Sequence, residues 1–149
     1  MSDLNQAEKT LFIGIGNYGR SDDALGWIFI DHLANWCDQY DFEYRYQLQI
    51  EDAELISKYC RVFFIDASHE PIENGFSIYE CLPTPAGSFT SHQLSPETVL
   101  WLAGELFNAP PKGYVIGIRG INWELNHGIS NEAEKNLKNA LAYFQKWVN

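Results

Sequence analysis

The sequence predicts an α/β protein built in three layers, α/β/α, in which helices cover both faces of a largely parallel, twisted sheet of about five strands. Two observations predict this class. Short apolar runs alternate along the chain with longer segments whose apolar residues recur at helical spacing. The runs are apolar at nearly every position, which is typical of strands buried on both faces of a parallel sheet. The length of 149 residues and the 46% of hydrophobic residues suit one core, so we expect one domain over residues 1–149.

Five segments are predicted as strands. They span residues 11–16, 42–50, 61–65, 75–82 and 113–119. The first and third are nearly continuous apolar runs, and the third is followed directly by Asp66. The second alternates only loosely between apolar and polar residues. The fourth is entered through Glu73-Asn-Gly75, a typical turn sequence, and Pro83 and Pro85 end it.

Four helices are predicted between and after these strands. Serines stand where three of them begin and can accept a hydrogen bond from a free backbone N–H group of the first turn. These expected N-caps are Ser21, Ser95 and Ser130, and the remaining helix is a short one over residues 51–59. The apolar residues of the first helix recur at helical spacing and should face the core; they are Leu25, Ile28, Phe29, Leu33 and Trp36.

Composition and charge exclude several classes of protein. With 20 acidic and 10 basic residues, the formal net charge is −10, which repels nucleic-acid phosphates and anionic lipid. We therefore expect no nucleic-acid and no membrane partner, whereas a cation or a basic peptide would suit this charge. No apolar run approaches the roughly 18 residues that a membrane-spanning helix needs. The first ten residues do not resemble a signal peptide, so we expect a cytoplasmic protein.

Acidic and imidazole side chains stand at the ends of predicted strands and near a predicted helix start. Open α/β sheets bind ligands beyond the carboxyl ends of their strands, so residues at these positions are candidates. Asp23 follows the first strand by a short loop, Asp66 ends the third, and His92 precedes the helix capped by Ser95. Two carboxylates and one imidazole suit nickel, zinc or another first-row divalent ion. Three protein ligands also leave one position open for water or a substrate group, so the three residues are candidate metal ligands and catalytic residues.

Each of these residues also has a purely structural interpretation, which the sequence leaves open. Asp22 and Asp23 could simply interact with the dipole of the helix that they begin. Asp66 could be a structural end to its strand, although a lone buried carboxylate is costly. His92 could be an ordinary surface or core histidine. In that case His69, three residues after Asp66, is the best substitute ligand.

Residues 14–19 read GIGNYG and match the glycine pattern of dinucleotide-binding loops. That motif also needs an acidic residue at the end of the second strand, about 20 residues further on. Here the second predicted strand ends near Glu51, which is too far along the chain. Asp22 and Asp23 follow the glycines at a place where they would repel a pyrophosphate. A Rossmann-like nucleotide-binding domain is therefore an alternative that the sequence disfavours.

Four segments, taken in order, resemble the motifs of the nickel–iron hydrogenase maturation endopeptidases. They are residues 14–17 with the acidic pair that follows, residues 64–67, residues 91–94 and residues 123–130. The resemblance spans nearly the whole chain. It implies a twisted sheet between helices and a hydrolase that removes the C-terminal peptide of a hydrogenase large-subunit precursor after nickel insertion. It also implies that Asp23, Asp66 and His92 bind the nickel, which the substrate delivers and for which another divalent ion can substitute.

Two places depart from the pattern of many members of that family. Ala24 follows the acidic pair where many members have glycine. Residues 46–52 stand where many members carry a glycine-rich loop after the second strand. The resemblance therefore leaves the class of hydrogenase open. A metal-binding or chaperone-like relative that docks on a precursor without cutting it is the main alternative function.

Overall fold

The computed structural model describes residues 9–85 and 94–148 of the chain. The elements are β1 Thr10–Ile15, η1 Ser21–Ala24, α1 Leu25–Trp36, β2 Asp41–Arg45, α2 Glu51–Ile56, β3 Arg61–Ser68, η2 Glu73–Gly75, β4 Phe76–Cys81, α3 Pro96–Phe107, β5 Lys112–Arg119 and α4 Asn131–Val148. Strands and helices alternate along most of the chain, and the strands form one five-stranded sheet. The predicted α/β class and strand number are therefore confirmed.

The strand order of the sheet creates a crevice between two of its strands. The order is β2-β1-β3-β5-β4. β1 pairs in parallel with β2 on one side and with β3 on the other, and β5 is parallel to β3. β4, at one edge, runs antiparallel to β5. After β1 the chain forms β2 on one side of β1, and it then crosses over to form β3 on the other side. The carboxyl ends of β1 and β3 flank this reversal, which is where open α/β sheets bind ligands.

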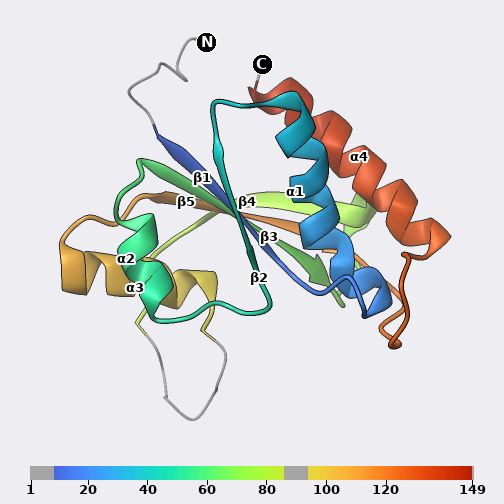
Figure 1. The fold of residues 1–149 in the computed structure, drawn as a ribbon, viewed down its shortest axis with the longest axis horizontal. Coiled ribbons are helices and arrows are strands. Elements are labelled where there is room, and N and C mark those ends of the chain that lie inside the picture. The colour runs from blue at the N-terminus through green and yellow to red at the C-terminus, as the bar shows by residue number, and fades with distance from the viewer. Residues whose placement is uncertain (1–8, 86–93, 149) are drawn as a thin grey trace.

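Helices cover both faces of the sheet, as predicted. α1 and α4 pack on one face, and α2 and α3 pack on the other (Figure 1). Successive residues of β1 point to opposite faces: Phe12 lies in the core under α1 and α4, and Leu11 and Ile13 lie under α2 and α3. Phe12 stacks on Phe63 with ring centroids 4.8 Å apart, and Phe144 of α4 lies edge-on 5.6 Å from each. Burial on both faces explains why the strand sequences are continuously apolar.

Two of the three expected N-caps are confirmed. The Ser95 hydroxyl accepts the backbone N–H of Thr98 at 3.1 Å, and Pro96 occupies the first position of α3. The Ser130 hydroxyl accepts the backbone N–H of Ala133 at 3.1 Å at the start of α4. Among the helices that the structure describes, none has both the length and the apolar character needed to cross a membrane.

The beginning and end of the first helix differ from prediction. Ser21 does not cap it: its backbone is left-handed, with φ of 50°, and its hydroxyl donates to the carbonyl of Glu124. The chain instead makes a turn of 3-10 helix, η1, before α1 begins at Leu25. Trp36 at the other end is 45% exposed rather than buried. The last turn of α1 therefore reaches past the core.

The second strand is shorter than predicted because one buried carboxylate turns the chain. β2 ends at Arg45, well before Ile50. The side chain of Asp52 accepts the guanidinium Nε of Arg45 at 3.0 Å and the backbone N–H of Gln49 at 2.9 Å. These bonds fold the chain after Arg45 back toward the start of α2. β3 is longer than predicted and runs to Ser68, because it pairs residue by residue with β5.

Candidate metal-binding and catalytic site

Asp23 and Asp66, predicted from distant parts of the sequence, lie in the same cavity. Asp23 belongs to η1, after β1, and Asp66 lies near the carboxyl end of β3. Both line a cavity of about 490 Å³. The other walls come from the end of β1, the loop after β2, the end of β3 and the start of α3: Ile15, Tyr46, Gln47, Leu48, Ala67, His69, Leu94, Ser95 and Pro96. The cavity thus occupies the crevice where the strand order reverses.

The charge of Asp23 disfavours the ionised form of Asp66. Burial and the neighbouring charge of Asp23 raise the pKa of Asp66 to about 7, against a smaller opposing effect from the backbone N–H of Ala67. Burial also raises the pKa of Asp23, while the charges of Arg20 and His69 act to lower it. Like charges held together in a partly desolvated site favour either a shared proton or a bound cation. The pair is therefore electrostatically suited to hold a metal ion.

Glycines allow the loop that carries Asp23 to lie directly over the sheet. A Cβ atom at Gly16 would overlap the backbone carbonyl oxygen of Asp23, and one at Gly26 would overlap the carbonyl oxygen of Ile65. The backbone N–H of Asn17 donates to the same Asp23 carbonyl at 3.0 Å. The glycine pattern over residues 14–19 thus has a packing role. It brings an acidic residue, rather than a phosphate-binding surface, to the end of β1.

Asp22 has a structural role that the sequence did not reveal. Its side chain is fully buried and accepts the backbone N–H groups of Ile121, Asn122 and Ser130 at 2.8, 2.9 and 2.7 Å. It also accepts the Ser130 hydroxyl at 2.8 Å. Burial alone would raise the pKa of Asp22, but these hydrogen bonds outweigh it and lower the pKa. Asp22 therefore ties η1 to the loop between β5 and α4. The one sequence signal for this tie was the resemblance over residues 123–130.

His69 lies at the rim of the cavity but does not complete a metal site with the two aspartates. Its imidazole stacks on the indole of Trp123, with ring centroids 3.7 Å apart and planes at 20°. Within residues 9–85 and 94–148, no three His, Cys, Asp or Glu side chains are close enough to hold one metal ion. His92, the predicted imidazole ligand, lies outside the described residues. Its role and the metal-binding roles of Asp23 and Asp66 stay predictions.

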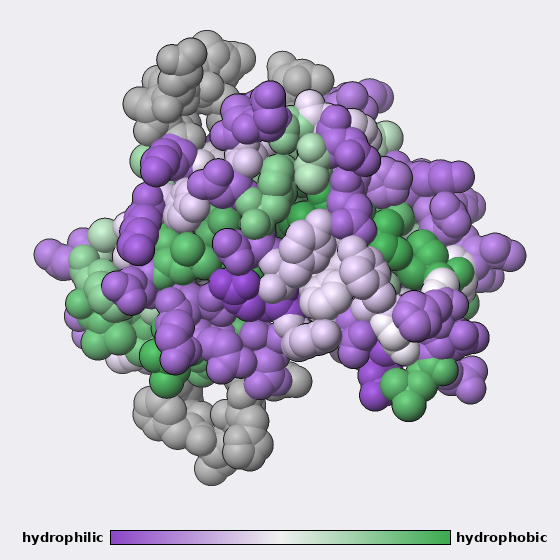
Figure 2. All heavy atoms as spheres, viewed as in Figure 1, coloured by the Kyte–Doolittle hydropathy of each residue, from purple (hydrophilic) through white to green (hydrophobic). Residues whose placement is uncertain are grey.

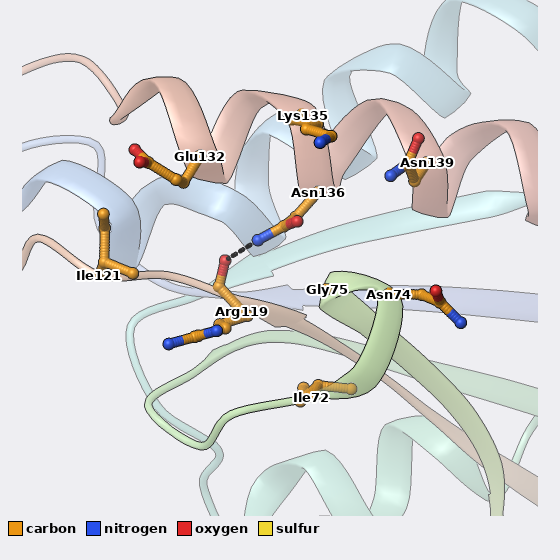
Figure 3. Close-up of a pocket in the computed structure, with 9 residues that line it drawn as sticks. All are labelled: Ile72, Asn74, Gly75, Arg119, Ile121, Glu132, Lys135, Asn136 and Asn139. Carbon is orange, nitrogen blue, oxygen red and sulfur yellow. Dashed lines mark hydrogen bonds between the residues drawn. The ribbon is translucent and has the colours of Figure 1, made fainter.

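A larger cavity than the one that holds Asp23 and Asp66 lies elsewhere among the described residues. It measures about 630 Å³ and lies between α4, η2 and the end of β5 (Figure 3). The side-chain amide of Asn136 donates to the carbonyl of Arg119 at 3.0 Å across it. Two basic side chains, Arg119 and Lys135, accompany its single carboxylate, Glu132. This cavity lacks a carboxylate pair, so its chemistry does not match the predicted site.

The fold matches solved structures along almost the whole chain. The NiFe hydrogenase maturation protease HycI from Thermococcus kodakarensis KOD1 is similar with a TM-score of 0.71 at 23% identity, covering 95% of this chain and 94% of that chain. The hydrogenase maturating endopeptidase HybD from E. coli has a TM-score of 0.67 at 18% identity, covering 94% and 91%. A hydrogenase 2 maturation peptidase from a Thaumarchaeota archaeon has a TM-score of 0.66 at 18% identity, covering 95% and 99%.

These similarities establish the fold: the chain folds as the hydrogenase maturation proteases do. The resemblance expected from the four sequence segments is thereby confirmed at the level of structure. No protein-family model matches the sequence, and no curated protein matches it. The observed fold agrees with the twisted sheet between helices that the sequence resemblance implies.

Proposed function

We propose that this protein is an endopeptidase that removes the C-terminal peptide from the nickel-loaded precursor of a hydrogenase large subunit. One observation carries the proposal. Asp23 and Asp66 meet in a cavity at the strand-order reversal of a fold that this chain shares with hydrogenase maturation proteases. Burial and the charge of Asp23 raise the pKa of Asp66. This shift supports the proposal, because a bound cation would stabilise both carboxylates in their ionised form.

In this proposal nickel arrives as part of the substrate. Asp23 and Asp66 bind it, and His92 supplies the third ligand. Leu94, which follows His92 by two positions, lines the cavity that holds the two aspartates. The site thus recognises a metal already held by the precursor, and recognition draws the precursor's C-terminal extension into the cavity. Another divalent ion of similar preference could bind the same ligands.

The reaction is a peptide-bond hydrolysis. A water oxygen adds to the scissile carbonyl carbon, the C–N bond breaks, and the leaving amine takes up a proton. Bound nickel could polarise the carbonyl group or activate the water. It could also act as a recognition group that positions the chain, so that proximity supplies much of the rate enhancement. All three routes use the same ligands, and kinetics of ligand variants would separate them.

Mass spectrometry of the precursor tests the proposal. Nickel-loaded precursor incubated with the protein should lose its C-terminal peptide, and nickel-free precursor should not. Asp66→Asn and His92→Ala should each abolish cleavage. Asp38→Asn and His127→Ala are matched controls, because both residues are exposed and line none of the cavities described above. Undiminished cleavage by His92→Ala would sink the assigned ligand set.

A second measurement separates cutting from docking. If the precursor binds in a nickel-dependent manner but keeps its full mass, the protein is the chaperone-like relative rather than a protease. Binding lost in Asp66→Asn would then still support the metal-recognition site. The cytoplasmic location expected from the sequence fits this processing role and is part of the proposal.

A further inference from the structure

Four aromatic side chains gather beside the edge strand β2. Tyr18 comes from the loop after β1, Trp27 from α1, and Tyr44 and Tyr46 from the end of β2 and the loop that follows. The Trp27 indole lies at their centre, with ring centroids 4.8, 5.6 and 5.2 Å from the rings of Tyr18, Tyr44 and Tyr46. We call these four residues the aromatic surface. In Figure 2, large side chains of near-neutral hydropathy gather over this region, between the end of β2 and the start of α1.

The rings of Tyr18, Trp27 and Tyr44 are held in place by hydrogen bonds. The hydroxyl groups of Tyr18 and Tyr44 both donate to the carboxylate of Asp31, at 2.6 and 2.5 Å. The indole N–H of Trp27 donates to the carbonyl of Arg45 at 3.0 Å. These bonds satisfy the polar atoms within the molecule and leave the ring surfaces available. Side chains fixed before binding lose little conformational entropy in a complex, and Tyr and Trp dominate binding energy at protein interfaces.

The aromatic surface remains open to solvent. Tyr46 is 72% exposed, Tyr18 39% and Tyr44 37%. If the cluster served only to hold α1 against β2, its outermost ring would gain stability by packing inward, yet Tyr46 projects outward. Contiguous exposed aromatic groups of this kind typically mark a site of interaction.

The aromatic surface is continuous with the candidate active site. Tyr46 contacts Trp27 and also lines the cavity that contains Asp23 and Asp66. A protein whose peptide enters that cavity must therefore pass over or rest against Tyr46. The carboxylate of Asp31 lies among these rings, and the whole chain carries a net charge of −10. A partner face with an apolar centre and basic side chains around it would complement this surface.

We propose that the aromatic surface docks the folded body of the protein whose C-terminal peptide enters the Asp23–Asp66 cavity. This inference rests on the proposed function and adds the second contact that the substrate makes. The contact lies outside the reacting groups. It therefore sets the affinity for the precursor without setting the rate of the chemical step.

Binding and cleavage of nickel-loaded precursor by surface variants test this inference. Tyr18→Ser should weaken precursor binding about tenfold, a typical loss for an interface aromatic residue. It should leave kcat at saturating precursor and the affinity for free nickel unchanged. Tyr18→Phe keeps the ring and should bind nearly as the unaltered protein does. Tyr143→Ser is the matched control, because Tyr143 is 50% exposed on α4 and contacts Phe76 instead.

The outcomes distinguish the two proposals. If Tyr18→Ser and Tyr44→Ser both fold and both bind precursor as the unaltered protein does, the docking surface is wrong while the protease function stands. A fall in kcat of these variants with unchanged affinity for the precursor would also overturn the docking surface. If the unaltered protein does not process the precursor, the proposed function itself fails. Precursor affinity should weaken as salt is raised, and salt-independent binding would contradict the basic partner face.

Discussion

Asp22 and Asp23 are adjacent in sequence and have different environments. The Asp22 carboxylate is fully buried and accepts four hydrogen bonds from the loop between β5 and α4. The Asp23 carboxylate is half-buried and faces the cavity that it shares with Asp66. A buried carboxylate with this many donors stabilises the fold. A carboxylate that faces another carboxylate is available for a ligand.

Substituting these two neighbours should separate stability from function. Asp22→Ala leaves three backbone N–H groups without their acceptor, so it should lower the free energy of unfolding by about 3 kcal/mol. Asp23→Ala should change the free energy of unfolding by less than about 1 kcal/mol and abolish precursor processing. Urea denaturation followed by Trp fluorescence measures the free energy of unfolding of both variants, and mass spectrometry of the precursor measures processing. A larger loss of stability for Asp23→Ala than for Asp22→Ala would reverse the assignment.

The raised pKa of Asp66 predicts how stability depends on pH. Its pKa in the folded protein is about 7, compared with 3.8 for an ordinary Asp. Between these values the folded protein holds a proton that the unfolded chain has released. The contribution of Asp66 to stability therefore falls as pH rises from about 4 to about 7 and is constant above that. Asp66→Asn should remove this slope, as measured by denaturation at several pH values.

The same proton should compete with metal. Nickel affinity of the free protein should increase as pH rises toward 7 and level off once Asp66 is ionised. Isothermal titration across this range measures it. An affinity independent of pH between 5 and 8 would show that Asp66 does not bind the ion.

At the scale of elements, the site depends on how closely α1 approaches the sheet. Gly26, in the first turn of α1, lies against the backbone carbonyl oxygens of Ile15 and Ile65. A larger residue there would push the helix away from the carboxyl ends of β1 and β3. Because Asp23 is held in the turn that leads into this helix, such a shift would also move its carboxylate.

Two glycines in helices give a matched test of this close approach. Gly26→Ala would place a Cβ atom into backbone oxygens and should cost about 2 kcal/mol or more of stability. Gly104→Ala in α3 meets only Pro110 at 3.5 Å, an ordinary contact, and should be neutral or stabilise by up to about 1 kcal/mol. Thermal unfolding of the two variants measures the difference. Equal effects would show that backbone crowding at Gly26 is not important.

At the scale of the whole molecule, most of the sheet could be predicted from local sequence. A strand buried on both faces must be apolar at every position, so β1 and β3 are visible as continuous runs. Because parallel strands end at a common edge, Asp23 and Asp66 could be placed together before any contact was known. The caps of α3 and α4 could be predicted because the serine and the N–H group that it binds are close in sequence.

Features that depend on distant contacts could not be predicted. The role of Asp22 requires donors that lie about a hundred residues further along the chain. Ser21 takes a left-handed conformation because its hydroxyl bonds to Glu124, so its resemblance to a cap was misleading. The early end of β2 follows from the hydrogen bonds of Asp52. The pattern of apolar and polar residues in the strand does not predict these bonds.

The tie made by Asp22 also has a consequence for the order in which the site can form. A ribosome releases Asp23 and Asp66 well before residues 121–130, whose backbone groups hold Asp22. An unfinished chain therefore carries Asp23 on a turn that still lacks these hydrogen bonds, while Asp66 lies in β3. The site that Asp23 and Asp66 share is completed only when the last third of the protein has been made. If the proposed function holds, incomplete copies thus lack the geometry to compete for the precursor.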